Sequence, residues 1–154
     1  NGSKPRAVEE LFKAGLDSIR VSMNAAQPTW SESYFRPVGF SQNDAIESLT
    51  IASRYNRWAS INYFVMPGFT DTAEELTALK NLIEKTDLNM IQWRNLNIDP
   101  DWLFGKTNFT GNSKPLGIRY VMDEIHRSYT SVYFGYFNPH YEVMHRWQQQ
   151  TGNS

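Results

Sequence analysis

Residues 89–101 read NMIQWRNLNIDPD, an apolar stretch that becomes polar toward its carboxyl end. Residues 17–24 (DSIRVSMN) and 60–71 (SINYFVMPGFTD) follow the same pattern. Alternation of apolar and polar residues within these stretches predicts strands with one apolar and one polar face. Each is followed, directly or after a loop, by a helix-like stretch, which predicts parallel strands joined by crossover helices. The sequence therefore indicates an α/β fold with a ligand site at the carboxyl ends of its strands.

Helical spacing of apolar residues predicts four helices. Capping boxes are expected at two helix starts, where Ser41 is followed by Asp44 and Thr72 by Glu75. A fourth strand is expected at residues 130–137, although Gly135 weakens it. The helices are expected to run from Pro5 to Gly15, from Ser41 toward Tyr55, over residues 72–86 and over residues 115–128.

Two connections are longer than ordinary βα loops, residues 25–41 and 98–116, and are expected to serve in function or interaction. Within the second, Asp99-Pro100-Asp101 is expected to start a turn rather than to bind a metal. His140, Glu142 and His145 have a spacing that could attract a metal, but we interpret them as a solvated surface cluster, so no metal site is expected.

The chain has 154 residues, of which 40% are hydrophobic, enough for one globular domain. Its net charge of −1 gives no broad field that would attract nucleic acid or an anionic membrane. It contains no cysteine, so it can form no disulfide and supplies no thiolate to a metal or cluster. No transmembrane run or signal region is apparent, and a cytoplasmic location is expected.

The polar face of the expected strands conflicts with a closed barrel, whose interior is usually filled by apolar side chains. Polar groups buried there without partners would be costly. A partial barrel around a polar ligand removes this conflict, and so does a two-layer sheet whose polar face meets water. The side chains on this face are Arg20, Ser22, Asn24, Ser60, Asn62, Gln92 and Arg94.

Several segments together resemble the radical S-adenosylmethionine (SAM) enzymes. Asn1-Gly2 resembles the end of the third barrel strand of this family, and residues 11–24 (LFKAGLDSIRVSMN) resemble its third helix and fourth strand. Residues 62–72 (NYFVMPGFTDT) are similar to the fifth strand and its loop, although they depart from the family's GxIxGxxE pattern. Residues 91–100 (IQWRNLNIDP) look like the sixth strand.

The resemblance implies a fragment of a partial TIM-like (β/α)6 barrel with parallel strands. It implies that the cysteines of the CxxxCxxC motif, which hold a [4Fe–4S] cluster, lie upstream of Asn1. In the full-length parent, this cluster and SAM would generate a 5′-deoxyadenosyl radical that abstracts a substrate hydrogen. Residues 1–129 are expected to form the half-barrel and residues 130–154 an aromatic-rich extension. This chain alone is expected to hold no cofactor and to be inactive.

The resemblance also implies site residues, whereas it identifies no catalytic residue. Arg94 is the best candidate to clamp an anion, because a guanidinium meets a carboxylate or phosphate with two hydrogen bonds. Gly68 would allow close approach of the backbone to the adenine. The residues expected to lie near SAM or substrate are Ser22, Asn24, Asn62, Gly68, Arg94, Asn95 and Asn97.

Two other functions stay open. The chain could be a non-catalytic α/β binding module that self-associates through an exposed sheet edge, giving a homo-oligomer. It could also be a cysteine-free barrel enzyme of the aldolase or isomerase type, but such an enzyme would need a catalytic Lys or Glu at a strand end, and the polar face contains none.

Overall fold

The computed structural model describes residues 1–107, 109 and 114–144. At its centre is a sheet of four strands in the order β1-β2-β3-β4, and every neighbouring pair is parallel. This arrangement confirms the predicted α/β fold, and the described residues form an open sheet rather than a closed barrel. The strands are β1 (Ser18–Met23), β2 (Trp58–Val65), β3 (Met90–Asn95) and β4 (Tyr133–Phe134).

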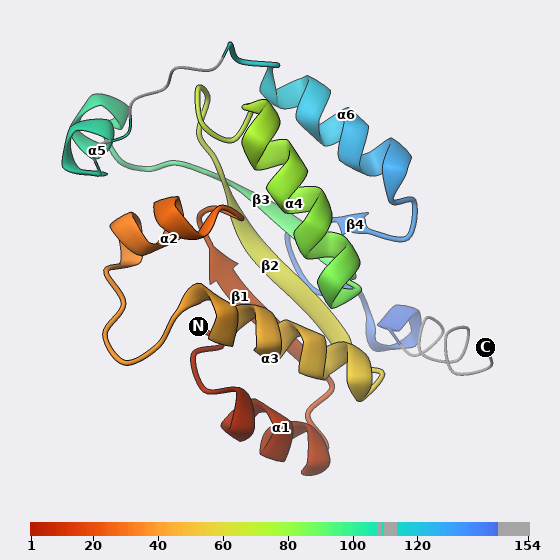
Figure 1. Ribbon diagram of the computed structural model, residues 1–154. Coiled ribbons are helices and arrows are strands. Elements are labelled where there is room, and N and C mark those ends of the chain that lie inside the picture. Colours follow the sequence, from red (N-terminus) through yellow and green to blue (C-terminus); the bar gives the residue numbers. More distant parts are fainter. Residues whose placement is uncertain (108, 110–113, 145–154) are drawn as a thin grey trace.

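The helices lie mainly on one side of this sheet (Figure 1). Helices α3 and α4 pack on the sheet, with α1 beside α3 and α6 beside α4, whereas α2 and α5 lie near the carboxyl ends of the strands. The six helices are α1 (Pro5–Lys13), α2 (Pro28–Phe35), α3 (Gln42–Arg54), α4 (Ala73–Thr86), α5 (Pro100–Thr107) and α6 (Ile118–Ser128), and residues 141–144 are also helical.

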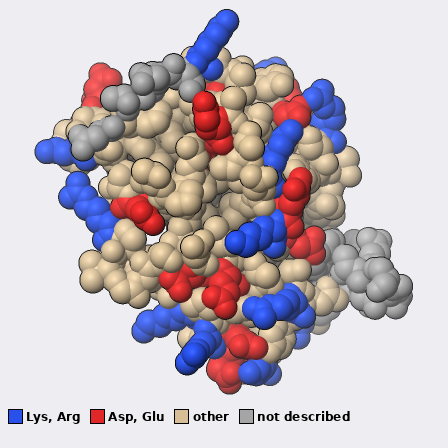
Figure 2. All heavy atoms as spheres, viewed as in Figure 1, with Lys and Arg blue, Asp and Glu red and all other residues tan. Residues whose placement is uncertain are grey.

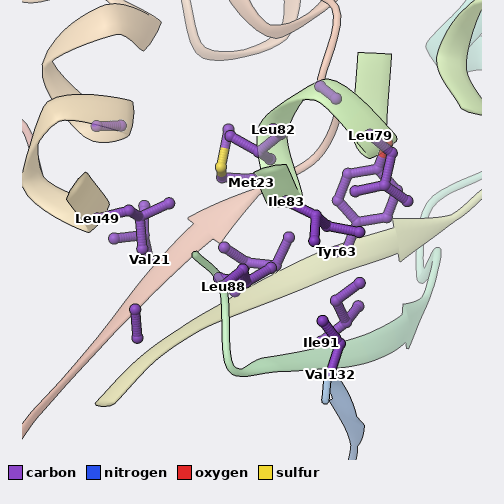
Figure 3. Close-up of a cluster of buried hydrophobic side chains, with 14 of the residues drawn as sticks. Val21, Met23, Leu49, Tyr63, Leu79, Leu82, Ile83, Leu88, Ile91 and Val132 are labelled. Atoms are coloured by element: carbon purple, nitrogen blue, oxygen red, sulfur yellow. The ribbon is translucent and has the colours of Figure 1, made fainter. Parts of the chain in front are cut away.

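The main core lies between the helices and the apolar face of the sheet (Figure 3). Val21, Ile61 and Ile91 occupy one row across β1, β2 and β3, and all three are fully buried. They pack against α3 and α4 through side chains such as Leu49 and Leu79. Burying a side chain of this size stabilises the fold by about 1.5–3 kcal/mol, so this face holds the sheet and the helices together.

The long connections at residues 25–41 and 98–116 are not loops throughout, because each contains a helix. Pro28 opens α2, and Trp30 is buried with its ring centroid 4.5 Å from that of Phe69. In α5 the Asp99 carboxylate accepts the Trp102 N–H at 2.8 Å and Pro100 is the first helical residue. The expectation that Asp99-Pro100-Asp101 starts a turn was therefore wrong, since Asp99 caps a helix.

The predicted fourth strand is present but spans two residues instead of eight. It pairs with β3 through Tyr133 and Phe134, and the chain leaves β3 after Gly135, whose N–H donates to the Ile91 carbonyl oxygen at 3.3 Å. A Cβ at Gly135 would lie 3.2 Å from the Met90 sulfur, so a larger residue would require the Met90 side chain to shift by a few tenths of an ångström.

Charged side chains of both signs are interspersed over the helix-bearing face (Figure 2). This pattern agrees with the net charge of −1 and offers no single-sign field on the face in view. None of the helices in the described part of the chain is long and apolar enough to cross a membrane.

Candidate functional site

The side of the sheet opposite α3 and α4 carries the polar side chains, and we call it the polar face. Strand alternation and the parallel register bring its members into rows, such as Ser22, Asn62 and Gln92. It includes two arginines and no Asp or Glu, so any charge that it presents is positive. In β1, β2 and β3 the polar face consists of Ser18, Arg20, Ser22, Trp58, Ser60, Asn62, Phe64, Met90, Gln92 and Arg94.

Arg20 is held at the amino-terminal half of this face by neutral acceptors. Its Nε donates to Ser60 Oγ and its Nη1 to Gln92 Oε1, both at 3.2 Å. Its Nη2 donates to Asn138 Oδ1 at 2.6 Å, which fastens the segment after β4 to the sheet. Burial lowers the pKa of Arg20, and the nearby charge of Arg94 lowers it further. Arg20 is therefore a structural cation rather than a free ligand group.

Arg94 lies one row beyond Gln92 and is half-buried. Its guanidinium carbon is 5.6 Å from the ring centroid of Tyr136, a cation–π contact with the same segment that binds Arg20. Among the described residues its guanidinium has no ion pair, so it keeps donors for an anion. Asp17, which precedes β1 at the opposite end of the sheet, pairs with Arg57 at 3.6 Å.

Ser22 and Asn62 lie side by side near the carboxyl ends of their strands. The Asn62 amide is 3.5 Å from Ser22 Oγ, at the limit of a hydrogen bond, and Asn62 Oδ1 has no partner in the described part of the chain. Ser22 is exposed. The structure thus brings two of the residues expected at the site together, with an exposed hydroxyl from Ser22 beside an amide whose unpaired oxygen is buried.

Asn24, the residue after the end of β1, is in a different situation. Its side chain is 1% exposed, and neither its Oδ1 nor its Nδ2 has a hydrogen-bond partner among the described residues. Because a buried amide without partners costs about 1–3 kcal/mol, this side chain is a source of strain next to the site. Its amide atoms are buried, so a ligand would not contact them without a movement of the side chain.

The remaining predicted residues are more dispersed. Gly68 has a φ of +87° and its N–H donates to Asp71 Oδ1 at 2.6 Å, so this glycine serves the turn after β2, and no atom approaches its open side within 4 Å. Asn95 is the last residue of β3, where alternation assigns it to the face opposite Arg94, and Asn97 is exposed in the following loop.

A buried carboxylate that sequence reasoning did not place here supports the site. Glu75 is fully buried in α4, and it accepts hydrogen bonds from the Tyr63 hydroxyl, from Ala26 N at 2.6 Å and from Gln27 Nε2 at 2.9 Å. Burial raises the pKa of Glu75, and these donors oppose that rise. Burial and the adjacent carboxylate raise the pKa of Tyr63. The network fixes the chain that follows Asn24.

Thr72 and Glu75 do not form the predicted capping box in full. Thr72 Oγ1 accepts the Glu75 N–H at 3.2 Å, as expected for the cap. The Glu75 side chain, however, bonds the residues after β1, and the Thr72 N–H donates to the Phe69 carbonyl oxygen. The box predicted at Ser41 is confirmed, since the Ser41 side chain accepts from the Asp44 N–H and Asp44 Oδ2 accepts from the Ser41 N–H at 2.6 Å.

The described residues contain no group of three potential metal ligands. His140 and Glu142 are exposed, whereas His145, the third member of the cluster considered from the sequence, lies outside the described residues.

The polar face therefore offers a guanidinium, an amide and a hydroxyl, without a carboxylate or a thiolate. Such groups can bind and orient a polar anionic ligand, but they include no strong base or nucleophile. The sequence matches no protein-family model and no curated protein, so the assignment of function depends on this arrangement of side chains.

Proposed function

We propose that the chain is the SAM-orienting part of a radical SAM enzyme and that its polar face holds SAM and the substrate. The observation that supports this proposal most is the gathering of Ser22, Asn62 and Arg94 on one open face of a parallel sheet, near the carboxyl ends of its strands. Ligands of α/β folds bind at this edge.

The residues present are compatible with the chemical groups of SAM. Arg94 suits its carboxylate, since the guanidinium has no anionic partner among the described residues. Ser22 and Asn62 suit ribose hydroxyls, which both donate and accept hydrogen bonds. The Oδ1 of Asn62 and the amide of Asn24 are unpaired but buried, so either would meet a ligand only after its side chain moves.

The contribution of this chain is orientation. When bound, SAM and an iron–sulfur cluster supply the radical chemistry of hydrogen abstraction. The chain has no cysteine, so the thiolates that hold the cluster would come from outside the given sequence. Arg20 keeps Gln92 and the segment after β4 in place, and Glu75 fixes the chain after Asn24. The proposal includes a cytoplasmic location.

Although the resemblance implies a chain that holds no cofactor by itself, the open polar face should keep measurable affinity for SAM alone, and isothermal titration of SAM into the chain tests this proposal. We expect Arg94→Gln to weaken SAM binding about ten-fold or more, because a hydrogen bond between charged groups contributes about 1.5–3 kcal/mol. The matched control is Arg119→Gln, which removes an exposed arginine from α6 and should leave affinity unchanged. Absence of SAM binding to the unchanged chain, or equal effects of the two variants, would count against the proposal.

A second function, self-association without catalysis, is favoured by a separate observation. Within the described residues β1 pairs only with β2, so the other edge of β1 remains open to another strand. Sedimentation velocity over a range of concentrations tests this candidate, because association along an edge increases the sedimentation coefficient with concentration. A constant monomer value would exclude it.

A further inference from the structure

A groove outside the polar face has the size and composition of a small-molecule site. It lies between α2 and α5 and has a volume of about 600 Å³, within the range of about 300–1,000 Å³ found for ligand pockets. Both helices belong to connections that follow a strand at its carboxyl end, β1 for α2 and β3 for α5. The groove is lined by Ser33, Tyr34, Arg36, Ile98, Trp102, Leu103, Lys106 and Thr107.

The groove offers flat, apolar surface. Trp102 is 57% exposed and Ile98 is 38% exposed, a large solvent-facing area for two apolar side chains, and Leu103 is buried at the base of α5. Tyr34 contributes a half-buried ring from α2. Aromatic side chains of this kind bind planar apolar groups by stacking and by removing them from water.

The charges that line the groove have one sign. Arg36 comes from the carboxyl end of α2 and Lys106 from the last turn of α5, and the described residues that line the groove include no Asp or Glu. The Arg36 backbone is fixed in the left-handed conformation with φ 44°, and its N–H donates to the Glu32 carbonyl oxygen at 2.8 Å. Two cations from different helices favour a ligand with an anionic group.

The groove is connected to the polar face through aromatic rings. The Tyr34 ring packs edge-on against Phe64, with centroids 5.5 Å apart, and Phe64 is a member of the polar face in β2. A ligand in the groove would therefore lie next to the site proposed for SAM. This contiguity is the geometry that a substrate needs, because the group that reacts must reach the neighbouring cofactor.

We propose that the groove between α2 and α5 binds a small molecule with a planar apolar body and one carboxylate group, with Trp102 and Tyr34 contacting the body and Arg36 and Lys106 the carboxylate. This inference names the substrate class for the proposed function and rests on it for the role of substrate. Binding itself depends only on the groove.

The test compares two probes of equal shape, indole-3-acetate and indole-3-acetamide, titrated into the full chain at low ionic strength and followed by NMR. The acetate should bind about ten-fold more tightly than the amide, the advantage of a charge-assisted contact. The double variant R36Q/K106Q should remove this advantage and keep the amide affinity. Trp102→Ala should lower the affinity for both probes about three-fold or more. This variant should still fold because Trp102 is largely exposed.

Two matched controls separate this inference from the SAM proposal. Lys85→Gln removes an exposed lysine from the last turn of α4 and should change neither probe affinity. Arg94→Gln should weaken SAM binding and leave the affinity for indole-3-acetate unchanged. Either proposed site can therefore be refuted without refuting the other. The inference is overturned if neither probe binds, if acetate and amide bind equally, or if Lys85→Gln has the same effect as R36Q/K106Q.

Discussion

Replacing Asn24 by leucine should stabilise the protein, although Asn24 is a buried polar residue. Its side chain is 1% exposed, and both ends of its amide lack partners among the described residues. Leucine has the same branching at Cγ and no polar atom to leave unpaired, although its two methyl groups are larger than the amide oxygen and nitrogen that they replace. Since an unsatisfied buried group costs about 1–3 kcal/mol, Asn24→Leu should raise the free energy of unfolding by about 1–2 kcal/mol. For a chain of this length the midpoint of thermal unfolding should rise by about 2–8 °C.

Urea unfolding followed by tryptophan fluorescence measures this effect. The midpoint should increase while the slope stays constant, which shows a change in stability rather than in the surface exposed. The control is Gln92→Leu, which should destabilise by about 1 kcal/mol because Gln92, 2% exposed, accepts a hydrogen bond from Arg20. If Asn24→Leu lowered the free energy of unfolding by about 1 kcal/mol or more, the amide would have partners and the reasoning would be refuted.

Three further predictions concern groups around the site and on the surface. Glu75→Ala should lower the free energy of unfolding by about 3 kcal/mol in urea titrations, because several buried donors lose their acceptor. Tyr136→Leu should weaken SAM binding about two- to five-fold in calorimetry by removing the cation–π contact with Arg94, whereas phenylalanine at this position should preserve it. The hydrogen bond from Lys80 lowers the pKa of Glu124 below its ordinary value of 4.5. The stability that this pair contributes is therefore present above pH 4.5 and is lost as the pH falls through the lowered pKa. Unfolding measured across acidic pH should show a smaller loss of stability in Lys80→Met than in the unchanged chain.

The sheet could be predicted because its signal is local. In β3, alternation of Ile91 and Trp93 with Gln92 and Arg94 specified both faces before any contact was known. The two helices in the long connections were missed because neither presents a regular apolar stripe. Helix α2 is held by ring contacts of Trp30, and α5 by the Asp99 cap and Leu103. Pro at the first position of each helix was the signal available in the sequence.

The candidate site was predicted less completely, because its supports are long-range. Asn138 reaches Arg20 across 118 positions of the chain, and Glu75 reaches Ala26 across 49. No pattern within a window of sequence contains both partners of such a contact. The burial of Asn24 likewise depends on chain segments that pack around it, so its amide could be predicted to lie near the site but not to lack partners.

Amide chemical shifts mapped during a SAM titration show whether the polar face near the carboxyl ends of the strands binds SAM. We expect the largest changes around Ser22, Asn62 and Arg94 and no change on the helix-bearing side around α1 and α6. Shifts confined to the helix-bearing side, or no shifts at a saturating SAM concentration, would contradict SAM binding at the polar face.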